Sequence, residues 1–308
     1  MVPILVDSTA DDDSRRRALY DGALLFFTAR DSVRALCDHA SQMITEAFDP
    51  LDPMEAQSKL PVEEYVGIIG PLKTRFTNED SSKERLHDLL DDFGCDVSQT
   101  YFDVPKLRIV THSNYLTAGV GYAYKPHRDI WYSAPPCQLN WWLPISEIST
   151  ESALAFHPHW WNEAAPNTSG NFDPYEWNRV GRAEAAKHIT SDPRNHPAPS
   201  EPIELEPELR VVGGPASTLI FSAAHLHSTV PNTSRATRFS IDFRTVNQHD
   251  LVERVGAPNP DSASTGTTAR DFLRATDYER LPEDVVALYD IGSKHEGPLV
   301  FDPTTVGG

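Results

Sequence analysis

Apolar residues recur at helical spacing through much of the first hundred residues. Between residues 31 and 48 they return every three or four positions behind Asp31, an aspartate that can cap the start of a helix. A second amphipathic pattern covers residues 81–94, where leucines and Phe93 share one face and Gly94 suits a C-terminal stop. The pattern predicts that residues 1–103 are mainly helical.

From residue 104 to residue 246 the pattern changes to short β-rich runs separated by Pro, Asn, Gly and Ser. The sequence offers only one candidate for a crossover helix between them, over residues 181–189. This texture predicts an antiparallel sandwich or jelly roll with helices packed outside it. The expected strands lie within residues 106–112, 119–129, 137–145, 153–158, 217–223, 225–230 and 238–246.

We therefore expect one domain that is mainly β with flanking α. Residues 1–103 would form a helical support, and residues 104–246 a double-stranded β-helix core of the jelly-roll or cupin-like kind. Residues 247–308 would form a C-terminal helical extension, with helix over residues 268–290. The long, aromatic and proline-rich segment 160–204 is typical of a lid-like insertion rather than a second domain.

Composition and charge exclude several classes of partner. A formal net charge of −18 is not that of a nucleic-acid or anionic-membrane surface, since those partners usually bind basic stripes. The N-terminus resembles neither a signal nor a transit peptide, and no run approaches the roughly 18 apolar residues of a membrane span. We expect a cytoplasmic protein that binds a small molecule, and neither nucleic acid nor membrane. The oligomeric state stays open.

The run "YKPHRDIW" at residues 124–131 contains the first candidate chemistry. In a strand, His127 and Asp129 would point to one side and Arg128 to the other. An imidazole nitrogen and a carboxylate oxygen on the same side can occupy two neighbouring positions around a metal. The alternative is a pair of polar residues on a wet strand face, because His-x-Asp is short enough to occur by chance.

A third ligand is available in the run "FSAAHLHSTVPN". Both His225 and His227 are candidates, and strand parity cannot separate them because they would lie on one face. Two histidines and one carboxylate form the facial triad that suits non-haem Fe(II) oxygen chemistry.

The run "RFSIDFR" supplies a candidate anion site. Arg238 shares one face with Ser240, Asp242 and Arg244, while the opposite face is aromatic and should pack on helices or the second sheet. A guanidinium would then lie inside the barrel, where it needs an anionic partner. A dicarboxylate cosubstrate would provide one, since Arg can bind a carboxylate with two parallel hydrogen bonds.

The order His127-x-Asp129, His227, Arg238 resembles the Fe(II)/2-oxoglutarate-dependent oxygenases of the phytanoyl-CoA dioxygenase-like group. The segments "ISEISTESALAFHP" and "HSTVPNTSRATRFS" agree, and the resemblance covers roughly residues 107–246. It implies that His227 is the distal ligand, that Arg238 rather than Arg235 anchors 2-oxoglutarate, and that Thr229 adds a hydroxyl. The implied reaction uses Fe(II), 2-oxoglutarate and O2 to oxidise a small metabolite, with release of succinate and CO2. Hydroxylation is the expected outcome, with desaturation or ring formation as the alternatives.

The substrate pocket departs from that family. After the "ALAF" run the chain reads "HPHWW" where the family commonly has Pro-Gly-Ser-His, so the family's substrates cannot be assigned to this chain. For His157 and His159 within this run we expect a structural or substrate-contacting role rather than a second metal site. Asp129 argues against halogenation, because family halogenases replace this carboxylate with a small residue. Candidate pocket residues that face inward are Asn140 and Trp142, together with Gln138. Candidates near the entrance are Tyr122, Trp131 and Tyr132. For each aromatic residue the alternative is packing in the core.

Two other functions compete with an oxygenase. One is a cupin-like metal-dependent isomerase or dioxygenase that does not use 2-oxoglutarate, and the other is a non-catalytic jelly-roll binding protein. An inward Arg238 disfavours the first, which has no reason for an arginine at that spacing. The completeness of the motif disfavours the second.

Overall fold

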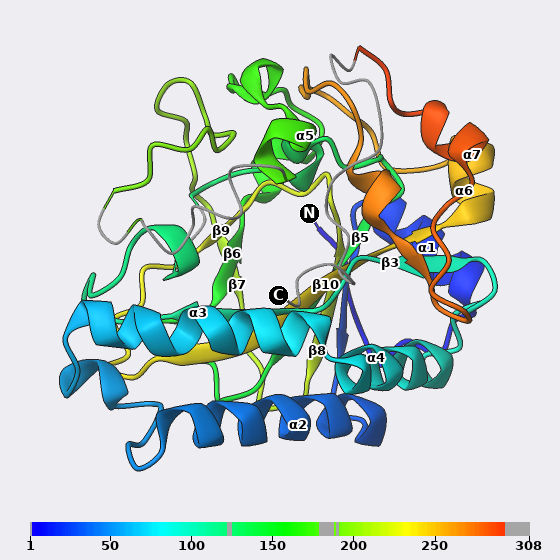
Figure 1. The fold of residues 1–308 in the computed structure, drawn as a ribbon. Coiled ribbons are helices and arrows are strands. Elements are labelled where there is room, and N and C mark those ends of the chain that lie inside the picture. The colour runs from blue at the N-terminus through cyan, green and yellow to red at the C-terminus, as the bar shows by residue number, and fades with distance from the viewer. Residues whose placement is uncertain (1, 122–124, 179–187, 189–190, 293–308) are drawn as a thin grey trace.

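The computed structural model describes residues 2–121, 125–178, 188 and 191–292 of the 308-residue chain. Two sheets form its centre, with helices packed on the outer face of the larger one (Figure 1). The order in the larger sheet is β1-β2-β8-β5-β10-β3-β11, and β4 also pairs with β10. Its strands are β1 Ile4–Val6, β2 Leu24–Phe27, β3 Thr100–Phe102, β4 Lys106–Val110, β5 Leu139–Pro144, β8 Thr218–Ser222, β10 Arg238–Asn247 and β11 Leu273–Arg274.

The smaller sheet has the order β7-β6-β9, formed by β7 Leu209–Val211, β6 Leu154–Phe156 and β9 His227–Thr229. An isolated antiparallel bridge between His127 and His227 adds a further segment beside β9. Along the chain, β5 lies in the larger sheet, β6 and β7 in the smaller, β8 in the larger, β9 in the smaller and β10 in the larger. This alternation is consistent with the predicted jelly-roll-like core.

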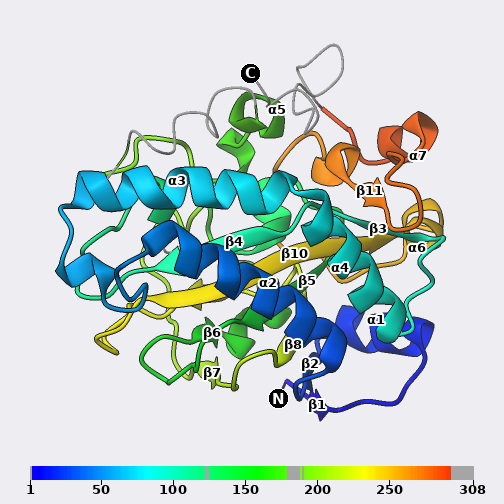
Figure 2. The same cartoon turned by 60° about the horizontal axis from the view of Figure 1, so that its bottom comes forward.

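Three long helices cover the larger sheet: α2 Asp31–Phe48, α3 Val62–Asn78 and α4 Asp80–Asp92 (Figure 2). The two predicted helices correspond to α2 and α4, and both are confirmed. Apolar residues of β5 and β10 pack against these helices, as in the edge-on contacts of Phe93 with Trp141 at 5.2 Å and Phe48 with Phe239 at 6.4 Å between ring centroids. The alternate residues of β10, including Arg238 and Asp242, therefore face the other sheet.

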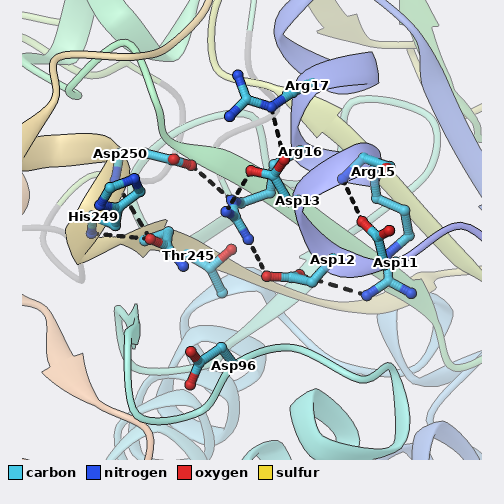
Figure 3. Close-up of polar contacts among 12 residues, drawn as sticks. Asp11, Asp12, Asp13, Arg15, Arg16, Arg17, Asp96, Thr245, His249 and Asp250 are labelled. Atoms are coloured by element: carbon cyan, nitrogen blue, oxygen red, sulfur yellow. Dashed lines mark hydrogen bonds and ion pairs between the residues drawn. The ribbon is translucent and has the colours of Figure 1, made fainter.

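Helix α1, Asp12–Tyr20, is hydrogen-bonded to the helix that directly follows β10. Asp11 caps it by accepting a hydrogen bond from the Ser14 amide at 2.8 Å. Asp250, in helix α6 Gln248–Val252, accepts 2.7 Å hydrogen bonds from Arg16 Nε and from the Tyr20 hydroxyl. Figure 3 shows Arg16 reaching Asp250 on one side and Asp12 on the other.

Two sequence predictions about secondary structure are corrected. Residues 268–290 form the turn η8 Thr268–Asp271, strand β11 and helix α7 Glu283–Ala287 rather than a continuous helix, because β11 pairs with β3. In place of the expected strand 119–129, the described residues form the 3-10 helix η2 Gly119–Gly121, the bridge at His127 and a further 3-10 helix, η3 Asp129–Tyr132, while residues 122–124 lie outside the described residues. The β1 and β2 strands stand in a region expected to be mainly helical.

The insertion contains only short elements where it is described, namely η4 Pro158–Trp161, η5 Ser169–Asn171 and α5 Pro174–Glu176. A further short turn, η1 Ala56–Ser58, joins α2 to α3. The predicted helix at 181–189 lies outside the described residues except for His188. No described helix is long and apolar enough to cross a membrane.

Candidate metal centre

Backbone pairing brings the His-x-Asp motif beside β9. His127 and His227 exchange two hydrogen bonds, each 3.0 Å from amide nitrogen to carbonyl oxygen. The Asp129 amide then donates to the Ala223 carbonyl at 2.9 Å. Two segments about a hundred residues apart in the sequence are thereby held side by side.

The side chains of His127, Asp129 and His227 converge in the interior. One potential ligand atom from each lies within 4.8 Å of the others, and all three residues are buried. His127 Nε2 is 3.2 Å from Asp129 Oδ1, and the two imidazole centroids are 4.4 Å apart. In the described part of the chain, this is the one group of three or more His, Cys, Asp or Glu residues with such a geometry.

Backbone carbonyls orient both imidazoles. His127 Nδ1 donates to the Lys125 carbonyl at 2.8 Å, and His227 Nδ1 donates to the His225 carbonyl at 2.9 Å. These bonds favour the tautomer whose Nε2 carries a lone pair, the form that binds a metal. Burial, followed by the charge of His127, lowers the pKa of His227 to about 3, so His227 is a neutral ligand at neutral pH.

The Asp129 carboxylate is held in its ionised form. Burial acts to raise its pKa, but the contact with His127 Nε2 and then the charge of Arg244 outweigh burial and keep that pKa well below its usual range. Arg244 Nε is 3.6 Å from Asp129 Oδ2. Gln138 Nε2 lies 3.5 Å from the same oxygen and donates to Asn140 Oδ1 at 3.1 Å. Two imidazoles and one carboxylate form a donor set that fits Fe(II).

His225 does not join this group. It is buried against the Trp161 ring, with centroids 4.4 Å apart, and its Nε2 has no hydrogen-bond partner among the described residues. The strand-parity argument could not separate His225 from His227 because it assumed a strand through both. Strand β9 begins only at His227, and His225 lies in the preceding turn.

Arg238 lies on the interior face of β10, as its alternation predicts. It is buried, donates to the Ser152 carbonyl at 2.8 Å and lies 5.7 Å from the Trp142 ring centroid. Its Nε has no partner among the described residues, and burial followed by the charge of Arg108 lowers its pKa to about 10. Thr229 follows His227 by two residues on β9 and pairs with Leu154 of β6.

The residues predicted to line the substrate pocket differ in what their side chains contact. Asn140 and Trp142 are buried on the inner side of β5, and the Tyr132 ring lies 5.5 Å from that of His127. Trp131 is fully buried in the core, where its indole Nε1 donates to Asp261 at 2.7 Å. Tyr122 lies outside the described residues.

The two histidines of "HPHWW" are also placed. His157 Nδ1 donates to the Leu205 carbonyl at 2.9 Å, and its Nε2 lies 3.0 Å from the Ser228 hydroxyl. His159 lies 3.4 Å from Glu163 at the surface. Neither belongs to the metal-ligating group.

The insertion also reaches the site through residues that the motifs do not mark. Asp192 accepts hydrogen bonds from His196 Nε2 at 3.2 Å and from the Gly119 amide at 3.3 Å, and it pairs with Arg194. Burial lowers the pKa of His196, and the hydrogen bond and charge of Asp192 only partly offset this. No sequence motif indicated these contacts, because they depend on how the insertion folds back.

No protein-family model matches the chain, and no curated protein matches it. Similar solved structures include EvdO2 from Micromonospora carbonacea var. aurantiaca, at 12% identity and a TM-score of 0.35 over 61% of this chain and 65% of that chain, less than two thirds of its length. The epimerase SnoN in complex with Fe3+, alpha ketoglutarate and nogalamycin RO matches at 12% identity and a TM-score of 0.41, over 77% of this chain and 85% of that chain.

A third similar structure is the nickel complex of the non-heme monooxygenase ThoJ, at 12% identity and a TM-score of 0.39 over 85% of this chain and 88% of that chain. These values are too low to carry an argument about this chain. The resemblance to the phytanoyl-CoA dioxygenase-like group therefore stays a prediction, and the functional assignment rests on the geometry of the site.

Proposed function

We propose that the protein is a non-haem Fe(II)/2-oxoglutarate-dependent oxygenase that hydroxylates a small metabolite and releases succinate and CO2. The observation that carries the proposal is the buried convergence of His127, Asp129 and His227, with potential ligand atoms within 4.8 Å of one another. Three protein ligands leave coordination positions for a cosubstrate and O2.

In this proposal His127 and His227 bind the iron through Nε2, and Asp129 binds it through its carboxylate. When bound, the iron would activate O2, and 2-oxoglutarate would supply electrons for the reduction of O2. The protein's part is orientation. The Nδ1 bonds hold the two rings, while Arg244 at 3.6 Å and Gln138 at 3.5 Å hold the Asp129 carboxylate.

Arg238 is proposed to anchor the distal carboxylate of 2-oxoglutarate. A buried guanidinium whose Nε lacks a partner among the described residues can still donate to an incoming anion. Exclusion of water strengthens such an ion pair and favours two parallel hydrogen bonds to the carboxylate. The Thr229 hydroxyl is proposed as a further donor. This use of Arg238 favours an oxygenase over a cupin-like enzyme that does not use 2-oxoglutarate.

The substrate is proposed to approach past Tyr132, with Asn140 and Trp142 on the inner wall. Tyr132 contacts both the His127 ring, at 5.5 Å, and Phe172 of the insertion, at 5.1 Å between centroids. Tyr132 therefore contacts both the proposed metal centre and the insertion.

Anaerobic titration of the protein with Fe(II), and then with 2-oxoglutarate, tests the proposal. Chelation of the iron by 2-oxoglutarate should give a weak visible charge-transfer band in the wild type. The band should be lost in the H127A variant. A wild type that binds Fe(II) without forming the band, or an H127A variant that keeps it, would contradict the assignment.

A further inference from the structure

Arg128 stands between the two proposed ligands His127 and Asp129, and its side chain is fully buried. Its Nε donates to Asp261 Oδ2 at 3.0 Å. The rest of the guanidinium donates to backbone carbonyls of two other segments, namely Ala224, Trp160 and Glu163, the last at 2.8 Å. Arg128 is thus turned away from the metal group and is bonded on every side.

Asp261 collects donors from the same surroundings. Its side chain is 3% exposed. Besides Arg128, it accepts the indole N–H of Trp131 at 2.7 Å and the amide of Ala165 at 2.9 Å. One carboxylate therefore joins the chain immediately around the proposed ligands to the beginning of the insertion.

The residues that follow Asp261 make further hydrogen bonds to residues 128–133. The Ser262 hydroxyl donates to the Ile130 carbonyl at 2.7 Å, and the Ser264 hydroxyl donates to it at 3.1 Å. The Thr268 amide donates to the Ser133 carbonyl at 3.0 Å. Segment 261–268 therefore braces residues 128–133, the loop that carries Asp129.

This bracing matters because the ligand loop is not part of a regular strand. His127 makes only an isolated bridge, and a 3-10 helix begins at Asp129. A continuous ladder would fix the directions of both side chains through the strand pleat. Here the pleat is interrupted between the two residues, so other contacts must set the angle between them.

We propose that the Arg128–Asp261 pair is a positioning device for the metal centre, which holds His127 and Asp129 at the angle needed to bind a metal together with His227. The inference rests on the proposed function for the identity of the ligands. It concerns two residues that do not belong to the metal-ligating group, and it assigns a role to an acid more than a hundred residues from His127 and Asp129 in the sequence. The same pair anchors the insertion through Trp160, Glu163 and Ala165.

Because Arg128 and Asp261 are buried charges of opposite sign, a conservative substitution of either residue should disturb the pair. A buried guanidinium requires its acid, and removal of one partner leaves the other uncompensated. The D261N substitution keeps the shape of the side chain and removes its charge. The R128K substitution keeps the charge but cannot reproduce the fan of bonds to three carbonyls.

The chain offers a matched control in Asp250. Its side chain is 2% exposed and accepts a 2.7 Å hydrogen bond from Arg16 (Figure 3). It accepts another of 2.7 Å from Tyr20, so that an arginine and an aromatic residue donate to it, as at Asp261. It contacts none of the three proposed ligands. The D250N variant therefore reports the general cost of neutralising a buried, arginine-paired aspartate.

The test is titration of each variant with Co(II) alone, with binding measured from the visible absorption of the bound Co(II). The temperature is one at which circular dichroism shows each variant to be folded. We expect D261N to weaken Co(II) binding by about 10- to 100-fold, the usual effect of removing a group that orients metal ligands. R128K should weaken it by about fivefold or more, and provides the test should D261N not fold. D250N should lower the melting temperature yet bind Co(II) within about threefold of wild type.

Unchanged Co(II) affinity in D261N and R128K, or an equal loss in D250N, would overturn the positioning role. Absence of Co(II) binding in the wild type would overturn both this inference and the proposed metal centre. Co(II) binding by the wild type without the 2-oxoglutarate band under Fe(II) would overturn only the proposed reaction.

Discussion

Arg244 Nε lies 3.6 Å from Asp129 Oδ2, which places the proposed carboxylate ligand at one end of a partly buried ion-pair network. Arg244 is also 3.3 Å from Asp242, and Arg108 binds Asp242 through two hydrogen bonds of 2.7 and 2.9 Å. Burial acts to raise the pKa of Asp242, but the charges of Arg108 and Arg244 prevail and lower it to about 2. The network thus keeps both carboxylates ionised at neutral pH.

Removal of Arg244 should destabilise the protein. In R244M, the carboxylates of Asp129, Asp242 and Asp103 lose a shared cation, which should cost about 2 kcal/mol of unfolding free energy, less than a fully buried pair because Arg244 is 18% exposed. R244K keeps the charge and should lose less. Urea denaturation at pH 7 measures both variants, and a loss below about 1 kcal/mol in R244M would show that the network does not depend on this residue.

His225 and His227 provide a matched pair for testing the ligand assignment. H227A should weaken binding of Co(II) by more than about 100-fold, because it removes one of three protein ligands. H225A should leave that affinity within about threefold but lower the unfolding free energy by about 2 kcal/mol, since it empties a buried position beside Trp161. Loss of metal binding in H225A with retention in H227A would reverse the assignment.

Arg238 and Arg235 test the cosubstrate anchor in the same way. Arg238 is buried on β10, whereas Arg235 is exposed in the preceding turn with a φ of 66°. R238M should weaken 2-oxoglutarate binding to the Fe(II) protein by about 100-fold, corresponding to about 2.7 kcal/mol for a charge-assisted bond pair. R235M should leave it unchanged. Equal effects of the two substitutions on the chelate band would exclude Arg238 as the anchor.

The sequence could predict the parts of the fold that depend on local periodicity. The helix at residues 31–48 and the alternation along β10 follow from the spacing of apolar residues, and both are confirmed. The proximity of His127, Asp129 and His227 followed from a motif whose members lie in a fixed order.

The remainder depends on tertiary contacts that leave no local signal. Strand β11 is set by pairing with β3, about 170 residues earlier, which overrides the helical pattern around Leu273. His225 lies in a bend before β9 begins at His227, which breaks the parity that sequence reasoning assumed. Asp261 lies in a polar stretch that reads as an ordinary loop, and only the fold places it against Arg128.

Lys73 is an unusual cation near the ion-pair network. It projects from α3, and its ammonium donates to the Val120 carbonyl, with no carboxylate within ion-pair distance among the described residues. Burial, followed by the charge of Arg108, lowers its pKa to about 7, and Asp242 only partly offsets this. The folded protein therefore releases this proton more readily than an unfolded chain does.

The stability of the protein should consequently rise with pH across a defined window. An ordinary lysine in the unfolded chain holds its proton up to about pH 10.4, whereas folded Lys73 has a pKa of about 7. Between these values the unfolded state binds more protons, so the unfolding free energy increases as pH rises; below pH 7 both states are protonated and the penalty is complete. K73M should remove this slope and raise stability at pH 7 by about 2 kcal/mol, less than the full shift implies because Lys73 keeps partial contact with water. Urea denaturation from pH 6 to pH 10 measures the slope, and identical slopes in wild type and K73M would show that Lys73 titrates as an exposed lysine does.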